Sequence, residues 1–508
     1  MALPRIDFPV KVAVIGAGSM GGGIAQLAAQ AGHEVRLFDA QEGAAPRAIE
    51  RIAADLAGAV QRGRLDEAQK QAVLGRITAA DTLQDLEGCG LAVEAIVEKL
   101  EPKQALFRQL EEVLDASAVL ATNTSSISIT AVAQGLVHPN RVVGWHFFNP
   151  APRMKLVEII PGLDTDPALL PEMHALSRAW GKTPVDAPNA PGFIVNRVAR
   201  PYYAEGLRLL AERLAPLEAI DRLMREAGGF SLGPFELIDL IGVDVNLSVT
   251  ESVYAATQHD NRYAPHLIQQ ELVRAGHFGR KTGRGFYDYR PTATKPHAVG
   301  LAPVGETPAL RMAAGGGGLL QPLLDRLQAA GAAFKRDHDL PGETFALGSV
   351  AVALTDGRTA TECAALAGSP VLLLDLARDF STTTLLGAAA SAGADEHLPT
   401  LAALLKPAGI ELLRLNDVAG LGVMRIVCGL ANEAADVMAW TGTRAQDIDV
   451  AMVLGTAYPM GPLAWADAIG ATRVVRVLEH LHAHYGEARY RRSPRLLRAH
   501  HARERLHA

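Results

Sequence analysis

Short hydrophobic runs alternate with longer segments of helical periodicity along the N-terminal part of the chain. The runs are VAVIG, EVRLFD, LAVEAIV, AVLATNTS, RVVGWHFF and LVEII. Apolar runs of this length, separated by helices, are typical of parallel strands joined by right-handed crossovers. The pattern predicts an α/β fold with a doubly wound sheet over residues 1–188.

The pattern changes twice after this sheet. From Gly192 to Tyr289 the periodicity is helical, which predicts an all-α domain over 189–290. Residues 291–344 have the Pro- and Gly-rich composition of a linker, with one helix expected between Leu319 and Ala330. The runs SVAVAL and PVLLLDLA then predict two buried parallel strands in a degenerate α/β segment, 345–408.

The helical domain is repeated near the C-terminus. A shift of 228 positions aligns the two regions without a gap, which indicates an internal duplication and a second all-α copy over 409–487. The basic, His-rich residues 488–508 are expected to form a solvated or disordered tail. The residues identical on this shift are Gly181, Gly192, Val195, Arg197, Glu205, Ile220, Asp221, Met224, Gly233, Pro234, Asp239 and Gly242, with counterparts Gly409, Gly420, Val423, Arg425, Glu433, Ile448, Asp449, Met452, Gly461, Pro462, Asp467 and Gly470.

Composition narrows the class of protein. The chain has 508 residues, 49 Lys+Arg against 55 Asp+Glu, and a net charge of -6, which argues against a nucleic-acid or membrane-surface binder. No apolar run reaches the roughly 20 residues that a membrane span requires. The three cysteines form no CxxC pair, so we expect a cytoplasmic enzyme without a metal site.

A glycine motif follows the first strand and carries the first chemical signal. KVAVIGAGSMGGGIA places Gly16, Gly18 and Gly21 in a GxGxxG turn between a strand and a helix. The glycines allow a tight turn, close approach of a pyrophosphate and close helix packing. Asp39, at the end of the next strand, can accept hydrogen bonds from ribose hydroxyls and would repel a 2′-phosphate. The motif predicts a Rossmann-like domain that binds NAD rather than NADP.

A histidine and a glutamate form the second candidate site. His146 ends one strand, and Glu158 lies 12 residues later in the next, so two adjacent strands could bring them together. A carboxylate on one imidazole nitrogen fixes the tautomer and raises the basicity of the other nitrogen, as alcohol oxidation requires of its general base. Taken alone, His146 would more often be a structural histidine, but its neighbouring motifs favour the catalytic role.

Taken together, these motifs resemble the NAD-dependent 3-hydroxyacyl-CoA dehydrogenases of fatty-acid and aromatic-acid breakdown. The resemblance runs from Val12 to Tyr289 through IGAGSMGGGIAQ, VEAIVE, NTSSISIT, HFFNP, PGFIVNR, GPFELID and KTGRGFY. The duplicated half is similar to the long bacterial form, which includes the 3-hydroxyadipyl-CoA and 3-hydroxybutyryl-CoA type of phenylacetate degradation. The resemblance implies oxidation of an (S)-3-hydroxyacyl-CoA and a homodimer or other homo-oligomer formed through helical domains.

The resemblance also implies roles for single residues. His146 would take the proton of the 3-hydroxyl group, with Glu158 as its partner. Ser125 and Asn196 would hydrogen-bond around the substrate oxygen and the cofactor. Further residues implied to contact NAD are Glu98, Lys103, Asn149 and Lys281.

A charged helical insertion at about 42–77 exceeds what a minimal crossover needs. The resemblance implies a helical arm that carries the coenzyme A portion of the substrate. Arg62 stands where the family often has Lys and keeps a cation for phosphate, whereas Asp55 stands where a small hydroxyl residue is common. A solvated helix face would explain such charges equally well.

Two other functions fit parts of this pattern. A gulonate-type sugar-acid dehydrogenase shares the catalytic motifs but is shorter, and a non-catalytic NAD-binding scaffold would not need Ser125, His146, Glu158 and Asn196. The second helical copy is expected to be structural, because Asn196 maps onto Met424 and no HFFNP or NTSS motif occurs after residue 300. Acyl-chain length and a preference for a distal carboxylate stay open.

Overall fold

The computed structural model describes residues 10–507, and the chain divides into two compact units. The first unit comprises the residues up to Arg197 together with Gln446–Thr456. The second comprises Val198–Ala445 and the residues from Ala457 on. Within the described residues no helix is both long and apolar enough to cross a membrane.

An eight-stranded sheet forms the centre of the first unit, in the order β3-β2-β1-β4-β5-β6-β7-β8. Neighbouring strands are parallel except for β6 and β7, which pair antiparallel. The predicted doubly wound sheet is therefore confirmed. The strands are β1 (Val12–Ile15), β2 (Val35–Phe38), β3 (Ile77–Ala80), β4 (Leu91–Glu94), β5 (Val119–Thr122), β6 (Val142–Phe147), β7 (Leu156–Pro161) and β8 (Thr183–Asp186).

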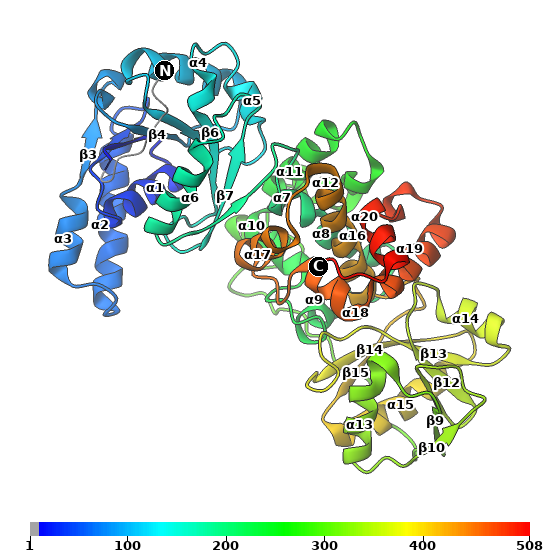
Figure 1. The fold of residues 1–508 in the computed structure, drawn as a ribbon. Helices are drawn as coiled ribbons and strands as arrows, with labels where there is room; N and C mark the ends of the chain where they lie inside the picture. The colour runs from blue at the N-terminus through cyan, green and yellow to red at the C-terminus, as the bar shows by residue number, and fades with distance from the viewer. Residues whose placement is uncertain (1–9, 508) are drawn as a thin grey trace. The chain divides into compact units, whose positions relative to one another are not determined.

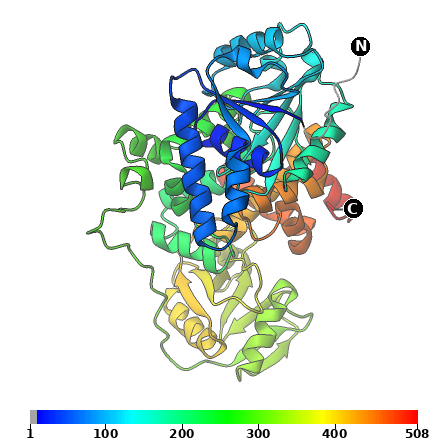
Figure 2. The same ribbon diagram turned by 90° about the vertical axis from the view of Figure 1, so that its left-hand side faces the viewer.

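Helices pack around this sheet, which Figure 1 draws in blue to cyan. Two of them, α2 and α3, lie side by side and form an arm within the predicted 42–77 insertion (Figure 2). The helices of the unit are α1 (Ser19–Gln30), α2 (Ala44–Gln61), α3 (Glu67–Leu74), α4 (Leu100–Val113), α5 (Ile129–Val132), α6 (Leu169–Ala179), the start of α7 (Val195–Val198) and nearly all of α17 (Ala445–Thr456).

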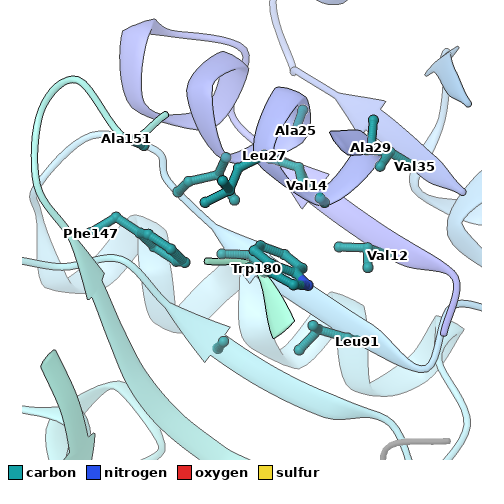
Figure 3. Close-up of a cluster of buried hydrophobic side chains, with 14 of the residues drawn as sticks. Val12, Val14, Ala25, Leu27, Ala29, Val35, Leu91, Phe147, Ala151 and Trp180 are labelled. Carbon is teal, nitrogen blue, oxygen red and sulfur yellow. The ribbon is translucent and has the colours of Figure 1, made fainter. Parts of the chain in front are cut away.

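The hydrophobic core of the first unit lies between β1 and its covering helices. All four residues of β1 are buried, as expected for a parallel strand covered on both faces. Figure 3 shows Val14, Leu27 and Trp180 in this cluster. The ring centroids of Trp180 and of Trp145 in β6 are 4.7 Å apart. This core fixes the strand ends that carry the candidate site.

The second unit contains both helical copies. We call α8–α12 the first helical copy and α16–α20 the second, although α17 clusters with the first unit. The 228-residue shift maps α10 onto α18 residue for residue, and Gly242 and Gly470 share positive φ angles of 104° and 93°. These helices are α8 (Arg200–Ala211), α9 (Leu217–Glu226), α10 (Pro234–Ile241), α11 (Val243–Ala256), α12 (Leu267–Arg274), α16 (Val423–Thr441), α18 (Pro462–Ile469), α19 (Ala471–Tyr485) and α20 (Pro494–Ala502).

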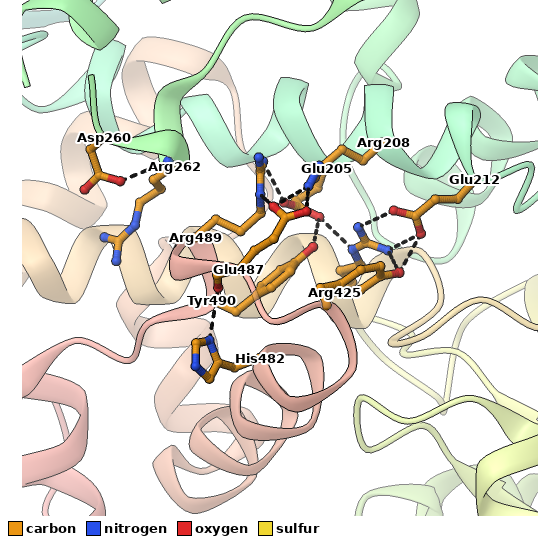
Figure 4. Close-up of polar contacts among 11 residues, drawn as sticks. Glu205, Arg208, Glu212, Asp260, Arg262, Arg425, His482, Glu487, Arg489 and Tyr490 are labelled. Atoms are coloured by element: carbon orange, nitrogen blue, oxygen red, sulfur yellow. Dashed lines mark hydrogen bonds and ion pairs between the residues drawn. The ribbon is translucent and has the colours of Figure 1, made fainter. Parts of the chain in front are cut away.

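Buried ion pairs join the two helical copies (Figure 4). The guanidinium of Arg425 in α16 is fully buried and donates to Glu205 of α8 over 2.6 Å and to Glu212 over 2.8 Å. Tyr490 also donates to Glu205, over 2.9 Å. Removing one partner of such a buried pair leaves an uncompensated charge, so loss of either partner would destabilise the packing of the two copies.

A second sheet has the order β10-β9-β11-β12-β13-β14-β15. Its strands β12 and β13 pair parallel, as predicted from SVAVAL and PVLLLDLA. The strands are β9 (Leu310–Ala313), β10 (Phe334–Asp337), β11 (Thr344–Leu347), β12 (Val350–Leu354), β13 (Val371–Leu374), β14 (Leu385–Ala390) and β15 (Glu411–Arg414), and the helices are α13 (Gln321–Ala329), α14 (Ala360–Ala367) and α15 (Leu398–Leu405).

The structure differs from the linker predicted over 291–344. The helix expected between Leu319 and Ala330 is present as α13, but β9 and β10 also lie in this range and extend the second sheet. Strand β10 is the charged sequence FKRD at the sheet edge, where one side of the strand has no partner strand. Such a strand needs few apolar residues, so the hydrophobic pattern missed it.

The expectation of a solvated or disordered tail over 488–508 is also corrected by the structure. Residues Pro494–Ala502 form α20, which packs on α16 and buries Leu496 and Ala499. The 228-residue shift places α20 on α12, so the tail completes the second helical copy. Its basic residues mask a short apolar stripe at helical spacing, which explains the wrong expectation.

Candidate active site

The GxGxxG turn has the backbone geometry that a dinucleotide requires. Gly16 has a φ of 102°, and a Cβ there would lie 2.4 Å from the carbonyl oxygen of Ala95. A Cβ on Gly21 would collide with the carbonyl of Gly16, so the helix packs directly on the turn. At Gly18 a Cβ would meet nothing within 4 Å, which leaves the N-terminus of α1 open to a phosphate group.

Asp39 lies beside this turn at the end of β2. Its carboxylate accepts hydrogen bonds from the backbone N–H of Ala17, over 2.6 Å, and of Gln41, over 2.9 Å. Arg51 of the arm donates to the carbonyl oxygen of Ala17 over 2.8 Å. The carboxylate is thus held at the position from which an acid accepts ribose hydroxyls. The residues present fit a dinucleotide.

His146 and Glu158 meet as predicted. They face each other in the antiparallel register of β6 and β7, and Nδ1 of His146 lies 2.6 Å from Oε2 of Glu158. Both side chains are buried, with 6% of His146 and 0% of Glu158 exposed. A carboxylate accepts the Nδ1 proton, so the neutral imidazole presents Nε2 as its acceptor.

The other oxygen of Glu158 is held by the start of α7. Oε1 accepts the backbone N–H groups of Ile194 and Val195, each over 3.1 Å. Phe148 and Phe193 place their rings 4.5 Å and 5.8 Å, between centroids, from that of His146. Four contacts thus fix the histidine and its carboxylate, which is the preorganisation that a general base needs.

Ser125 and Asn196 lie next to each other, at the end of β5 and in α7. The side-chain amide of Asn196 donates to the carbonyl oxygen of Ser125 over 3.3 Å. Glu98 accepts from the backbone N–H of Ser125 over 2.8 Å and from its hydroxyl group over 3.2 Å. Three of the predicted site residues therefore form one hydrogen-bonded group.

Lys103 reaches this group through Glu98. Its ammonium group is buried and lies 3.2 Å from Glu98 and 2.6 Å from Glu94. Burial alone would raise the pKa of Glu98, but Lys103 and hydrogen bonds from Thr124, among others, hold that pKa below its usual range. A contact of Lys103 with NAD stays a prediction. The structure adds that Lys103 forms an ion pair with Glu98.

Three other predicted residues lie apart from these contacts. Asn149 is exposed after β6 and precedes a cis proline. Arg62 is exposed at the C-terminal end of α2 in the arm. Lys281 belongs to the second unit, where its ammonium group lies 2.6 Å from Asp244. Their roles toward substrate or cofactor stay predictions.

Some supporting residues were not singled out from the sequence. Asn123 accepts the backbone N–H of Phe147 over 2.8 Å and so ties β6 to the end of β5. The hydroxyl group of Thr124 donates to Glu98 over 2.7 Å. Both belong to the NTSS motif, so the motif signalled them, but their individual contacts depend on the fold.

The second sheet contains a counterpart of this site. In the first sheet Leu156 of β7 pairs with Thr183 of β8, and in the second sheet Leu385 of β14 pairs with Glu411 of β15. The 228-residue shift places Glu411 on Thr183, so Leu385 corresponds to Leu156. Counting along the strands from these pairs places Gly387 at the position of Glu158. The N–H of Asp375 donates to the carbonyl of Gly387 over 2.9 Å, which places Asp375 at the position of His146.

The Asp375 carboxylate holds the start of α16 as Glu158 holds the start of α7. It accepts backbone N–H groups from Gly422 over 2.9 Å, Val423 over 2.7 Å and Met424 over 3.0 Å. Gly422 and Val423 are the counterparts of Ile194 and Val195 on the 228-residue shift. The second copy therefore keeps the helix cap while an aspartate stands in place of the histidine.

Comparisons with known proteins agree with this architecture. Residues 11–190 match the model for the 3-hydroxyacyl-CoA dehydrogenase NAD binding domain, and 192–289 and 420–506 each match that for the C-terminal domain. Residues 352–418 match the 3-hydroxybutyryl-CoA dehydrogenase reduced Rossmann-fold domain. The predicted duplication is thereby confirmed, with the second copy extending to 506.

Individual relatives cover most of the chain. It is 42% identical over 480 residues to the 3-hydroxyadipyl-CoA dehydrogenase of Escherichia coli K12, which covers 94% of this chain and 95% of that protein. A crystal structure of 3-hydroxybutyryl-CoA dehydrogenase from E. coli K12 is 40% identical, with a TM-score of 0.88 over 97% of this chain and 99% of that one. The probable 3-hydroxybutyryl-CoA dehydrogenase of Bacillus subtilis is 39% identical over 55% of this chain and 97% of its own length. The chain therefore belongs to the NAD-dependent 3-hydroxyacyl-CoA dehydrogenase family.

Proposed function

We propose that His146 is the general base with which this chain carries out the activity of its family, the NAD-dependent oxidation of a 3-hydroxyacyl-CoA to the 3-oxoacyl-CoA. The observation that supports this role is the buried pair of His146 and Glu158, whose second carboxylate oxygen is held by two backbone N–H groups. This arrangement leaves Nε2 as the proton acceptor.

In this mechanism the proton of the 3-hydroxyl group passes to Nε2 of His146 while the C3–H bond breaks. NAD, held by the glycine turn and Asp39, would supply the acceptor for the hydride that leaves C3. Glu158 stabilises the imidazolium that forms. Ser125 and Asn196 lie in one hydrogen-bonded group, and the hydroxyl group of Ser125 would turn from Glu98 to donate to the substrate oxygen, on which negative charge develops.

Other chain residues bind and orient the two partners of the reaction. The turn at Gly16 and Gly18 would let the pyrophosphate approach, the N–H groups at the start of α1 would donate to it, and Asp39 would accept hydrogen bonds from the ribose hydroxyl groups. Glu98, Lys103, Asn149 and Lys281 are proposed to contact NAD, as the family resemblance implies. Arg62 on the arm is proposed to bind a coenzyme A phosphate.

For the acyl group we propose a six-carbon dicarboxylic chain, as in 3-hydroxyadipyl-CoA. The relative of that name shares the duplicated architecture along 94% of the chain. A structure titled 3-hydroxybutyryl-CoA dehydrogenase shares it along 97%, so kinetics must distinguish the two thioesters. Steady-state kinetics with 3-hydroxyadipyl-CoA, 3-hydroxyhexanoyl-CoA and 3-hydroxybutyryl-CoA would test it. A higher kcat/KM for either monocarboxylic thioester would contradict the acyl preference and leave the family activity intact.

The experiment that tests the activity itself follows NADH formation at 340 nm, the wavelength at which NADH absorbs. We expect a signal with an (S)-3-hydroxyacyl-CoA and none comparable with free 3-hydroxy acids or gulonate. Turnover of gulonate alone would favour the sugar-acid alternative. No turnover of any of them, with NAD bound, would favour a non-catalytic scaffold.

The homo-oligomer and the cytoplasmic location also belong to this proposal. The family resemblance supports an assembly through helical domains, and three unpaired cysteines support a reducing compartment. Light scattering at assay concentration would test the first, and fractionation of the native cell the second. A monomer, or a protein recovered outside the cytoplasm, would contradict the corresponding point.

A further inference from the structure

Helix α17 belongs to the second helical copy in sequence but to the first unit in space. Its first residue, Ala445, is the counterpart of Leu217 at the start of α9. From Gln446 to Thr456 it clusters with the NAD-binding unit rather than with the other helices of its copy. The C-terminal half of the chain therefore contributes one helix to the unit that carries His146 and Glu158.

Helix α17 contacts two residues that neighbour Glu158 along β7 and at its carboxylate. A Cβ on Gly455 would come within 2.8 Å of Cδ2 of Leu156 and 3.1 Å of Cγ2 of Val195. Leu156 begins β7 two residues before Glu158, and Val195 donates one of the two N–H groups that hold its carboxylate. A side chain at position 455 would therefore require Leu156 and Val195 to shift.

The second unit shows the reciprocal contact. Helix α9, the counterpart of α17, packs against β14, and a Cβ on Gly422 would lie 2.9 Å from Leu223 of α9 and 3.2 Å from the carboxylate of Asp375. Ala227, the counterpart of Gly455, accepts the N–H of Arg378 over 2.8 Å. Each of these helices thus covers the carboxylate cap of the other copy.

We propose that α17 is a positioning segment of the active centre, and that Gly455 is the residue through which it acts. By filling the space behind Leu156 and Val195, it keeps the start of α7 against Glu158, and Glu158 in turn keeps the imidazole of His146 in place. This rests on the proposed roles of His146 and Glu158. It gives the second helical copy an indirect role in the reaction, through the position of Glu158 and His146.

The test crowds this contact in the full-length protein. Gly455→Val adds a branched side chain where a single Cβ is already too close, and it should push Val195 and its N–H away from Glu158. We expect kcat to fall by about tenfold, less than the roughly 10² to 10⁴ that general-base catalysis contributes, because the base is displaced rather than removed. The KM for the thioester and the Kd for NAD should stay within about threefold, because the dinucleotide turn is untouched.

Two control variants separate this effect from general packing. Gly429→Val crowds a glycine of α16 whose Cβ would meet Pro201 at 3.3 Å, within the second unit. Val453→Ala changes an exposed residue of α17. Both should keep kcat within about twofold in the folded protein. Leu156→Ala combined with Gly455→Val makes room for the new side chain and should recover most of the lost kcat.

A substrate carrying deuterium at C3 gives the deciding readout. If α17 positions the base, the isotope effect on kcat increases in Gly455→Val, because the chemical step becomes more rate-limiting; a loss of folded protein would not change it. Should Gly455→Val fail to fold, Gly455→Ala takes its place, with a smaller expected loss of about two- to fivefold. Wild-type kcat in a folded Gly455 variant, or an equal loss in Gly429→Val, would overturn the proposal. Failure of His146→Gln to lower kcat would instead refute the proposed function.

Discussion

Two sheets in this chain end in a buried carboxylate that accepts the first N–H groups of a helix. In the first sheet the carboxylate is Glu158 on β7, and its other oxygen binds His146 on β6. In the second sheet it is Asp375, which follows β13 at the position of the histidine, and glycine stands at the position of the glutamate. The helix cap is common to both, while the histidine occurs in only one.

The difference separates what packing requires from what chemistry requires. Unpaired N–H groups at a buried helix start are costly, so a carboxylate that accepts them is kept even where no reaction occurs. The histidine has no such structural task in the second sheet. In the second sheet the acid lies at the histidine position instead of the glutamate position. It still accepts the N–H groups of the helix, but no histidine stands beside it at that pair of positions.

The largest effect that would test this comparison is loss of the base. His146→Gln should lower kcat by about 10² to 10⁴, the usual contribution of general-base catalysis, with little loss of NAD affinity. Glu158→Gln should lower kcat similarly, because the imidazole loses its charge partner. Rapid-mixing measurements of NADH formation under saturating substrate would report the chemical step.

The matched control for these variants is Asp375→Asn in the second copy, which should leave the kcat of the folded enzyme within about twofold of wild type. Near wild-type turnover in His146→Gln, or a large loss in Asp375→Asn, would contradict the division of roles between the two sheets.

A smaller effect is expected from the nucleotide-binding half, which only the first sheet retains. β5 has the parallel neighbour β4 there, whereas the corresponding β12 pairs with the antiparallel β11. Asp39→Ala removes a charged acceptor of ribose hydroxyls, worth about 1.5 to 3 kcal/mol per hydrogen bond. The Kd for NAD should rise about tenfold to a hundredfold.

The same carboxylate should make the wild-type enzyme prefer NAD strongly over NADP. Comparison of kcat/KM for the two cofactors, in wild type and in Asp39→Ala, checks both points. Equal kcat/KM values for NAD and NADP in the wild type would show that Asp39 does not select the cofactor.

The sequence predicted the first sheet and its site better than the second. The GxGxxG turn and the pairing of His146 with Glu158 follow from strand ends that local patterns reveal, because side chains at adjacent strand ends must meet. The place of Lys103 did not follow from its position in α4, since its burial beside Glu94 depends on how that helix packs on the sheet.

The second sheet was harder to predict for a physical reason. Its edge strand β10 is polar, and β9 lies in Pro- and Gly-rich sequence, so neither shows the apolar run of a buried strand. The equivalence of Asp375 and His146 depends on strand register. The 228-residue alignment begins at Gly181 and Gly409 and therefore does not include these two residues. The Asp of PVLLLDLA was the available signal, but an acid after a strand has many explanations.

The buried carboxyl group of Asp375 should make the stability of the protein depend on pH. Burial raises the pKa of Asp375 from 3.8 to about 6, despite the opposing hydrogen bonds from Met424 and Val423. The folded protein then binds this proton more tightly than the unfolded chain, so its contribution to stability falls as pH rises from about 4 to about 6. A shift of this size corresponds to about 3 kcal/mol.

Urea unfolding of wild type and Asp375→Asn between pH 4 and pH 7 would measure this contribution. The quantity to compare is the difference in unfolding free energy between the two proteins. Burial also raises the pKa of Asp221 to about 7, and the pH dependence that this causes is the same in both proteins and cancels in the difference. The stability advantage of wild type should shrink by about 3 kcal/mol over this range. An advantage that grows with pH would mean that the N–H donors outweigh burial.

The smallest effect is expected at Met424, which the 228-residue shift places on Asn196. Met424 is fully buried in α16, and its backbone N–H is held by Asp375 with no histidine beside it. Met424→Ala should therefore cost stability, about 2 to 5 kcal/mol as for other buried methionines, yet leave the kcat of the folded enzyme within about twofold. Calorimetric titration should give one NAD per chain, because the second sheet lacks the glycine turn. Two bound equivalents, or lost turnover in a folded Met424→Ala protein, would show that the second copy does more than support the first.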